Sequence, residues 1–259
     1  MGTSTKKIYA AQFIRCGSTF TREFLSELDD FVATDNSHYF GDAIYNNQVT
    51  ICPIRDPITW YFSIWNYGRL RHRGDFYRLI NSRIFRLKHL KRSLGVNYLS
   101  SFKIFIGLFI VIKNPKQYFK KDTGFIKFCK FINSKKFKYI MGIKEFSHNQ
   151  GAMFDWLCLA SFSNNKKIKE HNNADDFLFK NTSIDNYIYL HGMDKEIINI
   201  LTENGYEQKY LEETLSKLTP NQNRTKYNLD INQFLDNDII DYINETEIFI
   251  NKLVRSIKK

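Results

Sequence analysis

Residues 8–21 read IYAAQFIRCGSTFT, and this stretch decides the fold. Its first half, residues 8–14, has the β-branched and aromatic composition of a strand, and a helical pattern opens directly after Gly17. At such a junction, backbone N–H groups and hydroxyls converge on the N-terminus of the helix, which favours an anion there. The stretch therefore predicts a strand–helix unit whose turn binds a phosphate-sized group.

A second segment of the same kind lies forty residues further along the chain. An apolar strand predicted over residues 48–54 leads into Arg55, after which Asp56 is suited to cap a helix and Pro57 to begin it. Ser63 follows Arg55 by eight residues, about two helical turns, so its hydroxyl could share an anion with that guanidinium. Two such sites at the ends of two strands imply a nucleotide that carries separated phosphates.

The rest of the pattern favours an α/β fold in one domain over residues 1–259. Strands and helices alternate through the first seventy residues, which is typical of a parallel sheet. Residues 74–142 are rich in Lys, Arg and Phe and are interpreted as a helical insertion within the domain. The remaining predicted elements are helices at 19–30, 56–70, 76–92, 98–112, 115–120, 123–133, 143–160 and 195–204, short strands at 31–34 and 186–190, and one long closing helix over 231–257.

The composition and charge of the chain favour some classes of binding partner over others, but they do not select a single class. The net charge of +11 favours an anionic partner, whether a nucleotide, an acidic glycan, a nucleic acid or a membrane surface. Four cysteines without a CxxC pair, and a polar start without a signal peptide, predict a reducing, cytoplasmic setting. The most apolar stretch, residues 104–112, is shorter than the roughly 20 residues needed to cross a bilayer. Peripheral membrane contact and the oligomeric state stay open.

Taken together, the two segments resemble the paired signatures of sulfotransferases that use 3′-phosphoadenosine 5′-phosphosulfate (PAPS). In that family a loop after the first strand holds the 5′-phosphosulfate, and its positions match residues 15–20 here. An Arg-Asp-Pro segment followed at a fixed interval by a serine holds the 3′-phosphate, and it matches residues 55–63. Residues 218–227 resemble a third family segment that precedes the closing helix. Ile14 and Cys16 depart from the pattern, which has a proline and a hydroxyl residue at these places.

The resemblance implies PAPS as donor, 3′-phosphoadenosine 5′-phosphate (PAP) as product, no metal, and a hydroxyl or amine acceptor that we expect to be a carbohydrate. It also implies a P-loop-like, three-layer αβα sandwich around a parallel sheet, with residues 74–142 as an acceptor-side lid. Arg15 is expected to stabilise charge on the leaving oxygen as well as to bind. The implied cofactor-binding residues are Arg15, Cys16, Gly17, Ser18, Thr19, Phe20, Thr21, Arg55, Ser63, Asn223, Thr225 and Tyr227.

The general base is predicted to be His38, because an imidazole takes a proton readily near neutral pH and relatives often carry a histidine between the two phosphate motifs. The alternative is an ordinary loop histidine, solvated or capping. The other candidates for the base are His148, His191, Asp42 and Glu145, while His72, His89 and His171 are expected at the surface.

Other interpretations stay open beside these. Trp60, Trp65 and Tyr67 could stack on a ring of the ligand or belong to the core, and the core is favoured. The basic run 69–73 and the basic insertion could bind an acidic acceptor or lipid, or form a solvated surface. A P-loop kinase would need magnesium and a triphosphate, and the first loop lacks its G-x-x-x-x-G-K pattern. A basic nucleic-acid-binding protein is the third alternative, although no recognised motif supports it.

Overall fold

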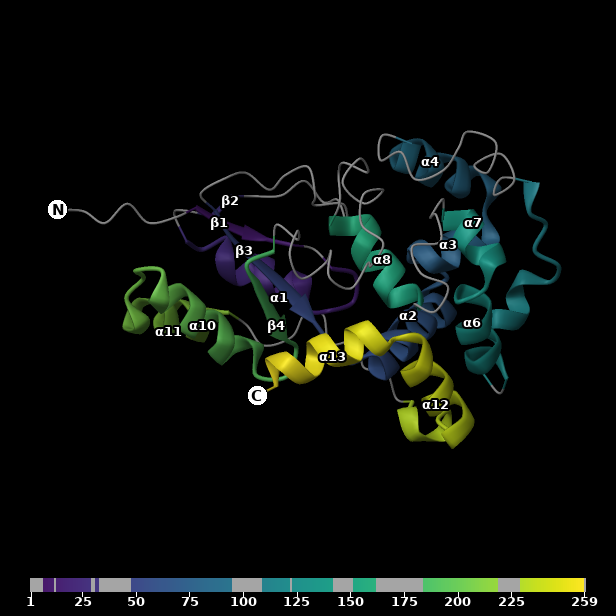
Figure 1. Ribbon diagram of the computed structural model, residues 1–259. Coiled ribbons are helices and arrows are strands. Elements are labelled where there is room, and N and C mark those ends of the chain that lie inside the picture. Colours follow the sequence, from purple (N-terminus) through teal and green to yellow (C-terminus); the bar gives the residue numbers. More distant parts are fainter. Residues whose placement is uncertain are drawn as a thin grey trace.

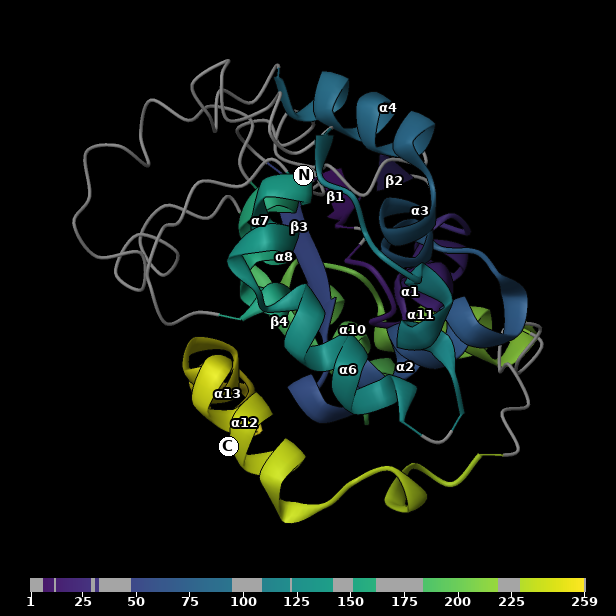
Figure 2. The ribbon, with the colours of Figure 1, turned by 90° about the vertical axis from the view of Figure 1, so that its right-hand side faces the viewer.

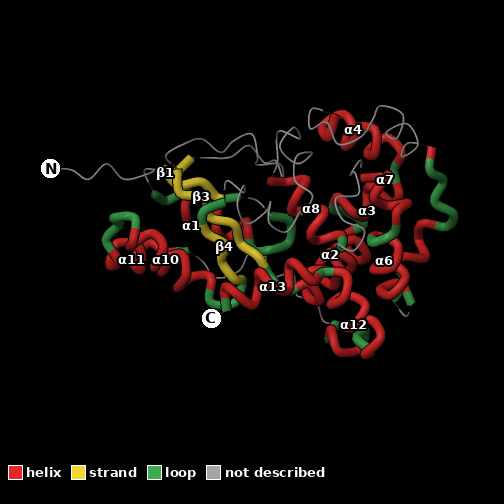
Figure 3. The backbone as a smooth tube through the Cα atoms, in the orientation of Figure 1, coloured by secondary structure: helices red, strands yellow, loops and turns green. Residues whose placement is uncertain are grey.

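The computed structural model describes residues 7–11, 13–28, 31–32, 48–94, 109–121, 123–141, 151–161, 184–218 and 229–258 (Figure 1). Most of these residues are helical, and the strands are short (Figure 3). The strands are β1 (Lys7–Ala10), β2 (Phe31–Val32), β3 (Gln48–Ile54) and β4 (Asn186–Tyr189). The helices are α1 (Ser18–Leu25), α2 (Pro57–Arg71), α3 (Asp75–Asn81), α4 (Arg83–Leu94), η2 (Pro115–Phe119), α6 (Gly124–Ile132), α7 (Lys135–Met141), α8 (Ala152–Ser161), α10 (Met193–Glu203), α11 (Gln208–Lys217), η4 (Ile231–Gln233), α12 (Asn237–Thr246) and α13 (Ile248–Ile257).

The strands form a parallel sheet in the order β2-β1-β3-β4, which confirms the predicted α/β class. Neighbouring residues along each strand point to opposite faces, because the side chains of a strand alternate. Ile8 and Ile51 pack with α1, α10 and α11 on one face, whereas Tyr9 and Cys52 join the larger core formed with α2, α8 and α13 on the other. Helices therefore cover both faces of the sheet.

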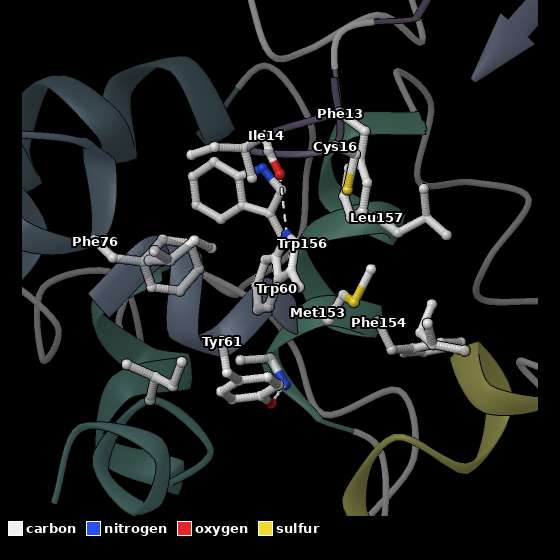
Figure 4. Close-up of a cluster of buried hydrophobic side chains, with 14 of the residues drawn as sticks. Phe13, Ile14, Cys16, Trp60, Tyr61, Phe76, Met153, Phe154, Trp156 and Leu157 are labelled. Carbon is white, nitrogen blue, oxygen red and sulfur yellow. Dashed lines mark hydrogen bonds between the residues drawn. The ribbon is translucent and has the colours of Figure 1, made fainter. Parts of the chain in front are cut away.

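The larger core is built around aromatic side chains of α2 (Figure 4). Trp60 is fully buried, lies 6.3 Å from Phe13 in a stacked arrangement, and meets the edge of Phe76 at 5.6 Å between ring centroids. Its indole nitrogen donates to the carbonyl of Ile14 at 2.9 Å, which ties α2 to the turn after β1. Trp65 is fully buried as well, so the prediction of a core position is confirmed for both tryptophans, whereas Tyr67, which the same prediction covered, is half-buried and belongs to neither core.

Helices α3, α6 and α7 of the predicted insertion contribute to this same core through residues such as Phe76, Phe128 and Phe137. They gather at the end of the molecule opposite α10 and α11 (Figure 1). The prediction of one helix over 76–92 was too simple, because the chain breaks at Ser82 between α3 and α4. The four cysteines are all buried, and no disulfide joins any of them.

A buried carboxyl interrupts the predicted closing helix, so the expectation of one helix over 231–257 was wrong. The chain forms η4, α12 and α13 instead, and Glu247 separates the last two. Its carboxylate, which is fully buried, accepts from the hydroxyl of Tyr61 at 2.6 Å and from the backbone N–H groups of Met153 and Phe154 at 2.7 and 3.2 Å. Glu247 thereby satisfies the N-terminus of α8.

Burial raises the pKa of Glu247 from 4.5 to about 8, although the hydrogen bonds from Tyr61 and Met153 act in the opposite direction. The carbonyl oxygen of the Asn133 side chain extends this cluster. It accepts from the N–H of Ala152 at 2.7 Å and lies 2.7 Å from the hydroxyl of Tyr61, whose single proton it shares with Glu247. Glu247, Tyr61 and Asn133 are called the Glu247 cluster below.

Candidate functional site

The strand order places a topological switch point between β1 and β3. From β1 the chain proceeds to β2 on one side, while β3 and β4 lie on the other side, so the direction of winding reverses between β1 and β3. In open α/β sheets, ligands bind outside the carboxyl ends of the strands at such a reversal. The turn that carries Arg15 follows β1, and Arg55 follows β3, so both predicted anion-binding segments lie at this point.

The turn after β1 is held in a conformation that glycine alone adopts easily. Arg15 has a φ of 61° and Gly17 a φ of 84°, both in the left-handed region, and Gly17 is the N-cap of α1. A side chain at Gly17 would lie 2.7 Å from Leu190 and 3.0 Å from Met193. Gly17 therefore lets α1 begin directly against the end of β4 and the start of α10.

The segment after β3 is fixed by the cap of α2, as its sequence predicts. Asp56 accepts from the N–H of Thr59 at 2.9 Å, and Pro57 occupies the first turn. Arg55 donates through Nε to the hydroxyl of Thr59 at 3.0 Å and through Nη1 to the carbonyl of Arg15 at 3.1 Å. Burial lowers the pKa of Arg55 below its ordinary value, while Asp56 opposes this shift.

One face of α2 positions both arginines. Thr59 contacts Arg55, Ser63 accepts from Nε of Arg15 at 3.1 Å, and the ring of Tyr67 lies 4.6 Å beneath the guanidinium of Arg15. These three residues are spaced by four along the helix and so lie on one stripe. Ser63 was predicted as a partner of Arg55, whereas in this structure its hydroxyl binds Arg15.

The roles of Thr59 and Tyr67 toward the arginines are not among the predictions. The four-residue spacing that connects them to Ser63 is visible in the sequence and could have indicated their common face. The pairing of Tyr67 with Arg15, 52 residues away in the chain, depends on the packing of α2 against the turn after β1. We call Arg15, Arg55, Thr59, Ser63 and Tyr67 the strand-end site.

The other predicted residues of the first loop divide into two groups. The side chain of Cys16 is fully buried, its N–H donates to the carbonyl of Phe13 at 3.3 Å, and burial raises the pKa of its thiol from 9.0 to about 12. Thr21 is fully buried as well, and its hydroxyl contacts the carbonyl of Gly17 and the sulfur of Met193. Both side chains therefore shape the turn from inside. The residues that remain partly exposed are Ser18, Thr19 and Phe20.

The end of β4 lies beside the cap of α2. The hydroxyl of Tyr189 donates to Asp56 at 3.4 Å, which connects β4 to the cap of α2. Lys258, beyond the end of α13, lies 4.2 Å over the ring of Tyr189. His191 is exposed and lies two residues after Tyr189, with 5.4 Å between the two ring centroids. A histidine thus stands at the same edge of the sheet as Arg55.

Four predicted site residues lie outside the described residues, namely His38, Asn223, Thr225 and Tyr227. The other base candidates His148, Asp42 and Glu145 lie outside them too, as does His171. His72 ends α2 and is exposed, as expected. Within the described ranges, no three side chains of His, Cys, Asp or Glu are grouped so that they could hold a metal ion.

In chemical terms, the strand-end site presents two guanidinium groups and a serine hydroxyl beside a helix N-terminus, at the carboxyl ends of β1 and β3. Such a set is suited to bind one or two phosphate- or sulfate-like groups. Comparisons of the chain with family models, curated proteins and solved structures found no match.

Proposed function

We propose that the protein is a PAPS-dependent sulfotransferase with a P-loop-like, three-layer αβα fold. One observation carries the proposal: Arg15 binds Ser63, and Arg55 binds the backbone of Arg15, at the reversal point of a parallel sheet. The two segments that resemble the 5′- and 3′-phosphate signatures therefore touch each other. A single bisphosphorylated nucleotide could be held by both.

The chain's own residues fit such a nucleotide in two places. At the first, the N-terminus of α1 has no side-chain cap, so its first backbone N–H groups are suited to an anion, beside the partly exposed Ser18 and Thr19. At the second, Arg55 and Ser63 would bind the 3′-phosphate. Because their side chains are buried, Cys16 and Thr21 are left out of the proposed contacts.

The proposed reaction moves a sulfuryl group from PAPS to an acceptor hydroxyl or amine. The bond between sulfur and the phosphate oxygen breaks, a bond from sulfur to the acceptor forms, and the acceptor proton passes to a base. Arg15 and the N-terminus of α1 would stabilise the charge that grows on the departing phosphate, an effect worth about 3 kcal/mol for one well-placed donor. PAP is then the second product.

The base is proposed to be His38, with His191 as the alternative that the structure places at the same edge of the sheet. Parallel variants decide between them. His38→Ala is expected to abolish turnover with nucleotide affinity unchanged, and His191→Ala to leave turnover largely intact. The reverse result would assign the proton transfer to His191.

The acceptor is proposed to be a carbohydrate, modified in the cytoplasm, with residues 74–142 on the acceptor side. These proposals rest on the resemblance of the motifs and not on the described contacts.

The decisive experiment compares thermal shifts with PAP, adenosine 5′-phosphate and ATP. We expect PAP to stabilise the protein most, because only PAP offers a 3′-phosphate to Arg55 and Ser63. Arg55→Ala should remove this preference. Arg71→Ala, an exposed change at the end of the same helix, is the matched control and should retain it.

Equal shifts with all three nucleotides would reject the proposal. A larger shift with ATP that requires magnesium would favour the kinase alternative instead.

A further inference from the structure

The positive charge of the chain is concentrated in one segment. Residues 74–141 contain sixteen Lys and Arg against two acidic residues, Asp75 and Asp122, which gives +14. The whole chain carries +11, so the remaining residues together carry −3. A charge asymmetry of this size points to an anionic partner for this segment in particular.

Helix α4, which belongs to this segment, presents an apolar and basic face to solvent. Ile84 is 71% exposed and Leu87 42% exposed, and the two are spaced by three so that they share a face. Arg83 and Lys88 are exposed on either side of them. Helix α4 lies at the periphery of the molecule in both ribbon views (Figures 1 and 2).

A buried arginine joins α4 to a second exposed apolar pair. Arg86 is 3% exposed and donates to the carbonyls of Leu79 and Ile80, which end α3, and to the carbonyl of Ile110 at 2.7 Å. Phe109 and Val111 flank Ile110. Their side chains are 76% and 55% exposed.

The segment 109–112 alternates between solvent and core, which fixes the outward direction of this pair. Ile110 and Ile112 pack against the larger core, whereas Phe109 and Val111 do not. Lys136, at the start of α7, donates to the carbonyl of Val111 at 3.0 Å, and Lys113 is exposed next along the chain. The exposed residues Ile84, Leu87, Phe109 and Val111 with Arg83, Lys88, Lys113 and Lys136 are called the α4 surface.

We propose that the α4 surface binds the anionic surface of a lipid bilayer. Exposed aliphatic and aromatic side chains among lysines and arginines suit an interface where apolar groups enter the acyl boundary and cations meet lipid phosphates. A nucleic acid would use the cations but would gain little from Ile84 and Phe109. Within the described residues, no helix is long and apolar enough to cross a membrane, so the contact is peripheral. The inference does not depend on the proposed sulfotransferase activity.

The test is flotation of the full chain with vesicles of phosphatidylcholine alone or mixed with phosphatidylglycerol. We expect binding to the mixed vesicles and not to the neutral ones. The double variant Ile84→Asn, Phe109→Ser should weaken binding at least about tenfold, because binding scales with the apolar area that enters the interface. Its matched control is Tyr210→Ser, Ile248→Asn, which changes two residues exposed at 42% and 44% elsewhere and should bind like the original chain.

A charge variant completes the test. Arg83→Gln, Lys88→Gln should weaken binding as well, whereas Lys195→Gln, Lys209→Gln, exposed on α10 and α11, should not. The thermal midpoint of each variant without nucleotide should equal that of the original chain, which shows that the variant is folded whether or not PAP binds. The thermal shift with PAP should be unchanged as well, so a failure of vesicle binding and a failure of nucleotide binding are told apart. Absence of vesicle binding, or binding that ignores the loss of Ile84 and Phe109, would overturn the proposal. Binding of a short RNA in place of vesicles would overturn it too.

Discussion

Helix α2 joins two polar clusters of opposite character. On one face of α2, Thr59, Ser63 and Tyr67 contact the arginines of the strand-end site. Tyr61, on the same helix, lies in the core and donates to Glu247. The first cluster is cationic and, apart from Ser63, partly exposed, whereas in the second Glu247 and Tyr61 are fully buried and Asn133 is partly buried.

The difference lies in the partners of each cluster. Glu247 accepts from the backbone of α8 and thereby connects helices that are distant in sequence. The contacts of Arg15 and Arg55 include two hydroxyls, a carbonyl and a ring face, which orient the two guanidinium groups. We infer that the Glu247 cluster stabilises the fold and that the strand-end site serves a ligand.

The largest expected effect comes from removing the buried carboxyl. Glu247→Ala leaves the hydroxyl of Tyr61 and the N–H groups of Met153 and Phe154 without this acceptor, and each such buried group costs about 1–3 kcal/mol. We expect the free energy of unfolding to fall by about 3 kcal/mol or more, measured by urea denaturation.

The matched control for this variant is Glu245→Ala, an exposed position on α12, which should change the stability by less than about 0.5 kcal/mol. At a temperature where both proteins are folded, the affinity of Glu247→Ala for PAP should equal that of the original chain. A Glu247→Ala protein of unchanged stability would remove the distinction between the two clusters.

These clusters also differ in how far the sequence predicts them. The two strand–helix units and the cap of α2 follow from local signals, namely an apolar run before a glycine turn and Asp56 before Pro57. Hence Arg15, Arg55 and Ser63 could be named as a site, and the structure brings them together.

The Glu247 cluster cannot be predicted from local sequence signals, because the apolar periodicity continues through α12 and α13 on both sides of Glu247. The break at Glu247 comes with its contacts to α8, about ninety residues away in the chain, which no local pattern records. For the same reason, the sequence does not predict that Tyr67 lies under Arg15. The sequence therefore predicts where helices and strands form better than it predicts which distant residues contact each other.

The next effect in size is the dependence of the protein's stability on pH. The pKa of Glu247 rises from 4.5 to about 8 on folding, so the folded state binds this proton more tightly than the unfolded state. Its contribution to stability is full below about pH 4.5 and is lost as the pH rises through about 8. The loss is limited to about 1.4 kcal/mol per pH unit.

The direction of this pH dependence is measured as the difference in the free energy of unfolding between the original chain and Glu247→Gln, which cannot ionise at this position. Unfolding in urea from pH 6 to 9 should show the original chain losing stability relative to the variant. The comparison cancels the other titratable groups near this carboxyl, which are Tyr61, Tyr242 and the Lys138–Asp155 ion pair. Parallel curves for the two proteins would contradict the raised pKa.

The smallest expected effect tests whether Tyr67 positions Arg15. The ring under the guanidinium contributes about 0.5–1 kcal/mol at a partly exposed site, which corresponds to a loss of about two- to fivefold in affinity when it is removed. We expect Tyr67→Leu to weaken the binding of PAP by this factor in isothermal titration, and Tyr67→Phe, which keeps the ring face, to bind like the original chain.

A merely structural role for Tyr67 would give a different result. It would lower the thermal midpoint of the protein without nucleotide, whereas a positioning role leaves that midpoint unchanged and alters the affinity alone. If Tyr67→Phe binds as weakly as Tyr67→Leu, the ring is not what holds Arg15. The orientation of Arg15 would then rest on hydrogen bonds such as the one to Ser63, and the strand-end site would resemble the Glu247 cluster in this respect.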